Sequence, residues 1–425
     1  MYLRRLSLVN YRNYRRLDLE LSPRLSIFWG DNGQGKSNLL EAVYLLATSR
    51  SFRTSAEREL VNWYAVTNPV FGRVVGDVVR HQVVTRLEVI LAEPQATRPA
   101  NAGAAGVANG NAALEVGADP APGQAPAASI RRRVRIGGHE RSVVDLLGHL
   151  NAVLFSPEDV ELVAGPAELR RRYLDITLCQ VSQHYLRILR RYVRVLQQRN
   201  ALLRQLRQRP ASPEQFEYWD DQVIELGSDL IIARLQAIAS LNQYLAEVYP
   251  RLASDSDRLT MEYRSTVPVD GLISVDRIDD DHNRNDGEVV TAVRERFRLH
   301  LVSMRARERQ LAVTLAGPHR DDAAFLAGSV DLRTYGSRGQ QRTAALALKL
   351  AEVQLMERHT GERPVLLLDD VLSELDPIRR RYLQDVIASQ EQVLVTATDL
   401  AFFQPELLEH ADRYRVFEGV VTRDG

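Results

Sequence analysis

The stretch Gly30-Asp31-Asn32-Gly33-Gln34-Gly35-Lys36-Ser37 decides the fold of this chain. It matches the G-x-x-x-x-G-K-[ST] pattern of a phosphate-binding loop at every position. The apolar run at 25–29 predicts a strand before the loop, and the apolar spacing after it predicts a helix with Leu39, Leu40, Val43 and Leu46 on one face. The glycines let backbone N–H groups turn towards phosphates, Lys36 reaches the β and γ oxygens, and Ser37 Oγ is a ligand for Mg²⁺. We therefore expect this loop to bind a nucleoside triphosphate together with magnesium.

A second run, Val365-Leu366-Leu367-Leu368-Asp369-Asp370, predicts a buried strand that ends in two carboxylates. Open α/β sheets bind their ligands at the carboxyl ends of the strands. We expect Asp369 to hold Mg²⁺, directly or through water, and Asp370 to orient or deprotonate the attacking water. A strand ending in two aspartates is weak on its own, but together with the complete loop it predicts a site for nucleotide hydrolysis.

A third motif, Tyr335-Gly336-Ser337-Arg338-Gly339-Gln340-Gln341, precedes a helix predicted at 340–358. Its Ser-x-Gly-Gln order is that of the signature motif of ABC-type ATPases. Ser337 is a good helix N-cap, and the start of a helix offers free N–H groups to an anion. An ordinary capped helix is the simpler interpretation, but the position upstream of the acidic strand favours the signature. Ser373-Glu374-Leu375-Asp376-Pro377 then matches the D-loop of the same class.

The composition describes an ordinary globular chain of 425 residues with a formal net charge of zero. It has no run of 18 or more apolar residues, so we expect no transmembrane helix, and its N-terminus lacks an apolar signal core, so we expect a cytoplasmic protein. The single Cys179 excludes an intramolecular disulfide and a cysteine-rich zinc site. Only two of the 55 basic residues, Lys36 and Lys349, are lysine. Lys36 therefore indicates a site that needs a compact ammonium group rather than a planar guanidinium.

Both ends of the chain show α/β patterning, and a helical segment lies between them. We expect an α/β fold in which a P-loop ABC-type ATPase head is assembled from residues 1–160 and 308–425. A helical arm domain at 161–307 is inserted into it. The stretch 95–130, rich in Ala, Gly, Pro and Asn, predicts a disordered loop, and residues 276–288 predict a solvated acidic loop.

Together these motifs resemble the RecF family of bacterial recombinational repair proteins, in the SMC/Rad50-like branch of ABC ATPases. The resemblance covers nearly the whole chain except the two loops. The stretches that carry it are Asn10-Tyr11-Arg12-Asn13-Tyr14, residues 30–46, Thr48-Ser49-Arg50-Ser51-Phe52-Arg53, Phe155-Ser156-Pro157-Glu158-Asp159, Arg171-Arg172-Tyr173-Leu174-Asp175, Gly317-Pro318-His319-Arg320-Asp321-Asp322 and residues 367–376.

The resemblance implies an ATP-dependent homodimer that sandwiches two ATP molecules. The loop 30–37 of one copy faces Ser337, Gly339 and Gln340 of the other. Lys36, Asp370 and Ser337 are then catalytic, and Ser37 and Asp369 hold Mg²⁺. Such a dimer binds single-stranded and duplex DNA at gaps or junctions and is a weak, DNA-dependent ATPase. Its family partners are RecO and RecR, and its role is recombinase loading and induction of the SOS response.

Two positions depart from the wider ABC pattern. The glutamate that usually follows the acidic strand is Asp370, one methylene shorter, which fits a slow hydrolase. The usual switch histidine is replaced by Thr398, so a hydroxyl would sense the γ-phosphate. The Q-loop glutamine has no secure match, and residues 156–158 are the nearest.

Two arginine groups are candidate DNA contacts. Between 168 and 209 the chain is strongly basic, and four arginines share one helix face: Arg187, Arg190, Arg191 and Arg194. The second group, beside the phosphate loop, is Arg50, Arg53 and Arg58. The alternative for the first group is that acids of the following helix neutralise it across a hairpin, namely Glu214, Glu217, Asp220, Asp221, Glu225 and Asp229.

Two other functions fit parts of the sequence. A nucleotide-binding subunit of an ABC transporter would need a membrane partner, but the insert is longer and more basic than that role requires, so we expect no membrane association. A non-hydrolysing, ATP-gated scaffold is the other, and the intact Asp369 and Asp370 argue against it.

Overall fold

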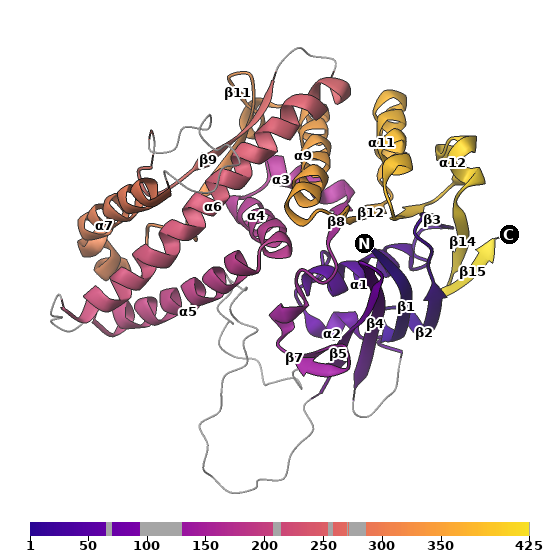
Figure 1. Ribbon diagram of the computed structural model, residues 1–425, viewed down its shortest axis with the longest axis horizontal. Helices are drawn as coiled ribbons and strands as arrows, with labels where there is room; N and C mark the ends of the chain where they lie inside the picture. The colour runs from indigo at the N-terminus through magenta and orange to yellow at the C-terminus, as the bar shows by residue number, and fades with distance from the viewer. Residues whose placement is uncertain are drawn as a thin grey trace, which may run out of the picture. The chain divides into compact units, whose positions relative to one another are not determined.

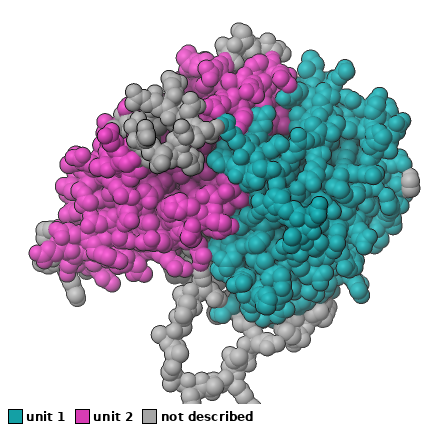
Figure 2. All heavy atoms as spheres, viewed as in Figure 1, with its two compact units in different colours: residues 1–110, 119–159, 352–425 teal, residues 111–118, 160–351 magenta. Residues whose placement is uncertain are grey.

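The computed structural model describes residues 1–64, 70–93, 130–206, 214–253, 258–269, 271 and 286–424. They form two compact units, coloured separately in Figure 2. Among the described residues, unit 1 contains those of 1–93, 130–159 and 352–424, and unit 2 contains those of 160–351. Unit 1 is thus built from both ends of the chain, as expected for the α/β head. Nearly all of the loop predicted at 95–130, and residues 276–285 of the acidic loop, lie outside the described residues.

Unit 1 contains a mostly parallel sheet with the strand order β15-β14-β3-β13-β12-β8. Only β15 pairs antiparallel to its neighbour. Strands β12 and β13 are buried at every residue, as expected for apolar runs in the middle of a parallel sheet. The carboxyl ends of β3, β13, β12 and β8 therefore meet at one edge. The bounds are β3 Leu25–Trp29, β8 Ala152–Phe155, β12 Val365–Asp369, β13 Val393–Ala397, β14 Asp412–Phe417 and β15 Val420–Asp424.

The second sheet of unit 1 is antiparallel, with the order β2-β1-β4-β5-β6-β7. Buried and more exposed side chains alternate along its strands. Leu8, Val74, Val89 and Val134 are fully buried on one face, and the other face carries polar residues. The bounds are β1 Tyr2–Tyr11, β2 Tyr14–Glu20, β4 Phe71–Arg80, β5 Val83–Ala92, β6 Arg131–Ile136 and β7 His139–Arg141.

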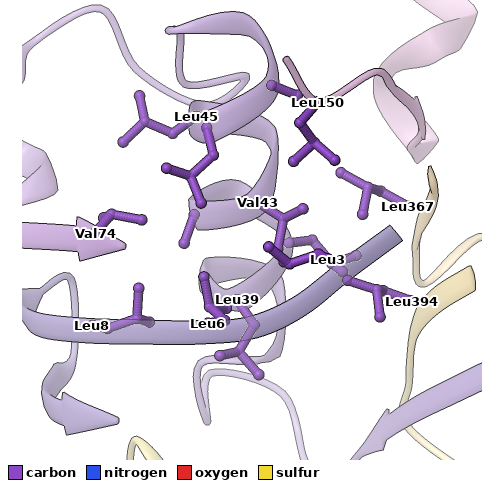
Figure 3. Packing of buried hydrophobic residues seen from close by; sticks show 14 of the residues in the cluster. Leu3, Leu6, Leu8, Leu39, Val43, Leu45, Val74, Leu150, Leu367 and Leu394 are labelled. Carbon is purple, nitrogen blue, oxygen red and sulfur yellow. The ribbon is translucent and has the colours of Figure 1, made fainter. Parts of the chain in front are cut away.

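Helix α1 (Lys36–Thr48) lies between the two sheets and contacts strands of both. Figure 3 shows Val43 with Val74 of β4 on one side and Leu367 of β12 on the other. The sequence predicted one apolar face, but the helix is buried almost all round because a sheet covers each side. The position of α1 places its N-terminus, and hence the phosphate loop, at the carboxyl edge of the parallel sheet.

Short helices complete unit 1. Asp376 caps α11 by accepting from the N–H groups of Ile378 and Arg379, and Pro377 occupies the first helical position, as the D-loop pattern predicted. The bounds are α2 Glu57–Leu60, η2 Val143–Leu146, η3 Pro157–Asp159, α10 Val371–Glu374, α11 Pro377–Ser389, η6 Leu400–Phe402 and α12 Pro405–Glu409.

Unit 2 is mainly helical, with one small antiparallel sheet of order β11-β10-β9. Helices α5 and α6 run side by side (Figure 1). Residues 167–205 form two helices, α4 and α5, which are separated at Ser182; its Oγ caps α5 by accepting from Tyr185 N–H. The bounds are α3 Val160–Ala164, α4 Ala167–Val181, α5 Gln183–Gln205, α6 Glu214–Leu252, β9 Leu259–Arg264, α7 Asp286–Leu311, β10 Asp322–Ala327, β11 Val330–Asp331 and α8 Leu332–Tyr335. Helix α9, Arg338–Thr360, begins in unit 2, and its residues from Glu352 onwards belong to unit 1. No helix in the described part of the chain is long and apolar enough to cross a membrane.

The limits of unit 2 differ from the expected arm domain. We expected residues 308–351 in the head, but they group with the helices of unit 2. Strand β10 pairs with β9, and Asp322 at its start forms an ion pair of 2.7 Å with Arg170 of α4. These tertiary contacts hold the segment in unit 2, and no local pattern in the sequence announces them.

Candidate phosphate-binding site

The loop between β3 and α1 has a backbone that requires glycine. Gly30, Gly33 and Gly35 have φ angles of +144°, +79° and +112°. A Cβ at Gly30 would lie 2.5 Å from the carbonyl oxygen of Val416, and one at Gly35 would clash with the Asn13 side chain. Backbone conformation at all three positions, and close neighbours at Gly30 and Gly35, therefore favour glycine over any residue with a Cβ.

The turn at the end of β1 braces this loop. Asn13 Nδ2 donates to the Gln34 carbonyl at 2.9 Å, and Tyr14 Oη donates to the Gly35 carbonyl at 3.0 Å. Asn38 Nδ2 donates to Asn13 Oδ1 at 2.8 Å. The Gln34 side chain is engaged with the backbone N–H of Glu418, so it also supports the loop. The sequence predicts no role for Asn13 itself, although the stretch 10–14 that contains it is one of those that carry the family resemblance.

Lys36 is folded onto its own loop. Its Nζ donates to the carbonyls of Gly30 and Asp31 at 2.6 and 2.8 Å, and the residue is 6% exposed. Burial lowers the pKa of the Lys36 ammonium, and the nearby carboxylates of Asp370 and Asp369 act in the opposite direction. The ammonium is thus desolvated and held over the phosphate loop, close to both acids.

Ser37 and Asp369 meet across the site. Ser37 Oγ donates to Asp369 Oδ1 at 2.7 Å, and Thr396 Oγ1 donates to the same oxygen at 2.7 Å. Burial raises the pKa of Asp369, and these two hydrogen bonds partly offset the rise. Two oxygen ligands in adjacent positions around one Mg²⁺, each at about 2.1 Å, lie roughly 3 Å apart. A hydroxyl and a carboxylate at the observed separation fit that ion.

Asp370 has one carboxylate oxygen without a partner. Its backbone is left-handed, with φ of 52°, and its N–H donates to Thr396 Oγ1 at 3.0 Å. Oδ1 is buried and accepts no hydrogen bond from the described residues. An unpaired buried acceptor is costly, so this oxygen marks a place where a water or ligand group is needed.

The carboxyl ends of β3, β13, β12 and β8 lie at one edge of the sheet, the edge at which open α/β sheets bind their ligands. Asp369 lies opposite Thr396 in the β12–β13 register, and Leu368 lies opposite Phe155 in the β12–β8 register. Glu158, just beyond β8, is close enough for its charge to raise the pKa of Asp369. Thr398 lies past the end of β13, partly exposed, with no hydrogen bond to the described residues. The sequence predicts a role for Thr398 but not for Thr396, which lies within β13 and contacts Asp369 directly.

Of the arginines beside the loop, Arg53 lies at the phosphate site. Its Nη1 donates to Asn38 Oδ1 at 2.9 Å, and its charge lowers the pKa of Asp369. Arg50 is half-buried, and Arg58 is exposed on α2. The three residues therefore do not share one environment.

The signature residues lie in unit 2. Ser337 Oγ accepts from Gln340 N–H at 3.2 Å, and Gln340 Oε1 accepts from Ser337 N–H at 2.9 Å. This reciprocal pair is a capping box, which leaves the N–H of Gly339 at the exposed start of α9. Ser337 is thus the N-cap that the sequence predicted.

The arginine stripe on α5 is not neutralised by α6. Arg187, Arg191 and Arg194 are exposed, Arg190 is half-buried, and none forms an ion pair within the described part of the chain. Of the acids of α6, Asp220 pairs with Arg199 of α5 and with Arg305, Asp221 pairs with Arg298, and Asp229 pairs with Arg294. In the described part of the chain these acids form one ion pair across the hairpin, Asp220 with Arg199, and it leaves the four arginines of the stripe unpaired.

Comparison with known proteins agrees with this geometry. Residues 1–80 match the family model of an AAA ATPase domain. Over 429 residues the chain is 42% identical to the DNA replication and repair protein RecF of Chloroflexus aurantiacus, with 99% of each chain covered.

Solved structures agree as well. A structure of the recombination mediator protein RecF-ATP in the RecFOR pathway is similar with a TM-score of 0.79 and 27% identity, covering 100% of this chain and 98% of that one. The crystal structure of an SMC head bound to the C-winged helix domain of ScpA, at a TM-score of 0.50 and 12% identity with 100% and 97% covered, shares the fold alone. The fold is that of a P-loop ABC-type ATPase head with an inserted helical segment. The chain belongs to the RecF family of DNA replication and repair proteins.

Proposed function

We propose that this chain is an ATP-dependent DNA-binding protein of recombinational repair and a weak, DNA-dependent ATPase. One observation carries the proposal above the others: Ser37 Oγ and Asp369 Oδ1, 332 positions apart in the chain, lie 2.7 Å from each other. This contact joins the phosphate loop to the acidic strand in one site. The family membership supports the choice of ATP and DNA as ligands.

The residues divide the chemistry as follows. The amides of residues 30–35 and the Lys36 ammonium bind the phosphates, and Ser37 and Asp369 hold Mg²⁺. When bound, Mg²⁺ neutralises charge on the phosphate oxygens. Asp370 Oδ1, buried and unpartnered in the described part of the chain, accepts a hydrogen bond from the attacking water and orients it. Thr398 follows the carboxyl end of β13, at the edge of the sheet that holds the phosphate site, and its hydroxyl senses the γ-phosphate.

We further propose that ATP closes a homodimer. Ser337, Gly339 and Gln340 of one copy complete the phosphate site of the other, supported by the free N–H groups at the start of α9. The closed dimer binds DNA at gaps or junctions, hydrolyses ATP and releases. In this role the chain acts with RecO and RecR in recombinase loading and SOS induction.

Light scattering tests the dimer. The Asp370→Asn protein should bind ATP and Mg²⁺ without turning over, and its mass should double at micromolar concentration. The same protein without nucleotide is the control. A mass that stays that of a monomer in saturating ATP would count against the sandwich.

Phosphate release tests the coupling to DNA. Adding duplex or gapped DNA should raise the steady-state ATPase rate, because the exposed arginines on α5 and elsewhere give phosphates a binding surface. A rate that DNA leaves unchanged would remove the DNA-dependent part of the proposal. No release above background in any condition would instead point to a non-hydrolysing scaffold.

A further inference from the structure

The outer face of the antiparallel sheet in unit 1 carries a row of arginines. Val9 of β1 lies opposite Arg16 of β2 on one side and opposite Arg73 of β4 on the other. Arg73 lies opposite Ile90 of β5, which lies opposite Arg133 of β6. Directly opposite residues project to the same face, so every second strand contributes an arginine to one row.

The spacing of this row follows from sheet geometry. Neighbouring strands lie about 4.8 Å apart, so successive arginines of the row are roughly 10 Å apart and the row spans roughly 20 Å. Arg131, two residues before Arg133 on β6, projects to the same face about 7 Å along the strand. The arginines therefore form a two-dimensional array rather than a single line.

The array has unbalanced positive charge. Seven arginines project to this face against five acids: Arg5, Arg16, Arg73, Arg86, Arg131, Arg133 and Arg135. Asp18 pairs with Arg5, Asp77 with Arg86 and Glu88 with Arg73, while Glu20 and Glu140 lie opposite Arg5 and Arg135 in the strand register. Arg16, Arg131 and Arg133 are exposed and form no ion pair within the described part of the chain. The contrast with Arg132 is clear, because Arg132 projects to the opposite face, is largely buried and pairs with Glu57.

Apolar side chains on this face are scattered and do not form a continuous patch. Ile90 is 6% exposed, Val9, Phe71 and Val75 are half-buried, and Val84, which is 44% exposed, lies at the other end of β5 from Ile90. A shallow hollow of about 140 Å³ lies between Ser7, Val75 and the flanking ion pairs, and the residues that line it are polar or charged except for Val75. A broad, polar surface with surplus guanidinium groups suits a polyanion with regularly spaced charges.

We propose that this sheet face is a nucleic-acid interface, in which Arg16, Arg131 and Arg133 contact the phosphates of duplex DNA. The inference rests on the proposed DNA-binding function and assigns it a surface that is distinct from both the α5 stripe and the arginines beside the phosphate loop. The two-dimensional array favours a duplex over a single strand, because a duplex presents two lines of phosphates to one flat face.

A salt series on a charge-neutral variant tests the surface. The Arg16→Gln/Arg133→Gln protein is compared with unmodified protein by fluorescence anisotropy of a labelled duplex and of one of its single strands, with ATP and Mg²⁺ present. Loss of two phosphate contacts should lower the slope of log Kd against log salt by about two and weaken duplex binding by about tenfold or more at low salt.

The matched control changes two exposed arginines of the same unit that lie elsewhere, Arg24→Gln/Arg381→Gln, which alters the net charge equally. It should bind duplex as the unmodified protein does. Unchanged thermal unfolding and ATP affinity in both variants show that the fold is intact, since neither pair contacts the phosphate site.

The outcomes separate the two proposals. The proposed surface is wrong if the test variant keeps the salt slope of the unmodified protein, or if the control variant loses as much duplex affinity as the test variant does. Either outcome leaves the DNA-binding function standing. A larger loss for the single strand than for the duplex overturns the assignment to duplex. An unmodified protein that binds neither DNA overturns the proposed function, and this surface with it.

Discussion

Lys36 is where a single side chain decides ligand binding. Its ammonium is buried and reaches two loop carbonyls within 2.8 Å, which leaves no room for a longer planar group. We predict that Lys36→Arg weakens ATP binding on the order of a hundredfold, about 2.7 kcal/mol, while the free energy of unfolding stays the same. Isothermal titration with ATP and Mg²⁺ measures it.

The chain supplies its own control for that change. Lys349, the other lysine, lies over the Tyr173 ring at 5.1 Å in unit 2 and does not belong to the phosphate site. Lys349→Arg should leave ATP affinity as it is. Equal affinities of Lys36→Arg and the unmodified protein would show that the site does not need a compact ammonium.

Asp369 gives the site a predictable pH dependence. Burial raises its pKa above that of a free aspartate, so it takes up its proton at a higher pH as the solution is acidified. Only the carboxylate form holds Mg²⁺. The Mg²⁺-dependent part of ATP affinity should therefore fall at a pH above the ordinary aspartate range, which a titration at a series of pH values detects.

Two threonines sharpen this test. Thr396→Val removes a hydrogen bond that stabilises the Asp369 carboxylate, so the midpoint should move to still higher pH. Thr398→Val removes no hydrogen bond to the described residues and should not move it. The same midpoint for Thr396→Val and the unmodified protein would contradict this role of Thr396.

At the scale of elements, a buried polar network ties the helices of unit 2 together. Arg199 of α5 bonds Asp220 of α6 and Glu308 of α7 at 2.8 and 2.7 Å. Arg234 of α6 bonds Asp175 of α4 at 2.7 Å and the Pro318 carbonyl at 2.6 Å. Buried charges of this kind specify one arrangement more than they add stability, since each must keep its partner.

His319 is a buried histidine of this region whose pKa changes on folding. Its Nε2 lies 3.2 Å from the Thr314 carbonyl and so carries the proton, and its Nδ1 accepts from Tyr192 Oη at 2.7 Å. Burial lowers the pKa of His319 from 6.5 to about 3. An unfolded histidine takes up a proton near its ordinary pKa while the folded one stays neutral, so the unfolded state gains protons first as the pH falls.

We predict that the free energy of unfolding of unit 2 falls as the pH falls from about 6.5 towards 3, because the pKa of His319 is lower in the folded than in the unfolded state. Urea unfolding near neutral pH and at about pH 5 measures the loss. His319→Gln, which is neutral throughout, should show a smaller drop between the two conditions. His410→Gln, on an exposed residue of unit 1, should keep the full drop. Equal drops for His319→Gln and the unmodified protein would contradict the assignment.

At the scale of the whole molecule, the proposed dimer divides each site between two copies. A Lys36→Arg protein would keep an intact signature, and a Ser337→Asn protein an intact phosphate loop. Asparagine caps helices as well as serine does, so the second change should leave α9 stable. Each protein alone should have almost no ATPase activity.

Mixing the two variants in equal amounts should restore activity. Half of the dimers at random pairing are mixed, and each contains one intact site of two, so about a quarter of the full rate is expected if the sites act independently. Phosphate release measures it, with each variant at the same total concentration as the control. A mixture no faster than its parts would mean that the signature does not serve a neighbouring copy.

Much of the site could be predicted because its chemistry is local. The glycines at positive φ, Lys36 and Ser37 follow one another, and the backbone they impose depends on their own residue types. The acidic pair could be predicted for the same reason, as the end of a short buried strand. Thr396 and Arg53 were not assigned to the site, because each reaches it through a tertiary contact that no neighbouring residue signals.

The sequence by itself determined the phosphate loop, the acidic strand end, the capped signature helix and the assembly of the head from both chain ends. These depend on backbone geometry and apolar periodicity within a few residues. Only the tertiary structure decided that 308–351 joins unit 2, that α1 is covered on both sides, and which arginines are free. Whether an arginine forms an ion pair depends on which acids folding brings within 4 Å of it. Arg132 and Arg133 are adjacent in the chain, but their side chains project to opposite faces of the sheet, and within the described residues only Arg132 of the two has an acid beside it.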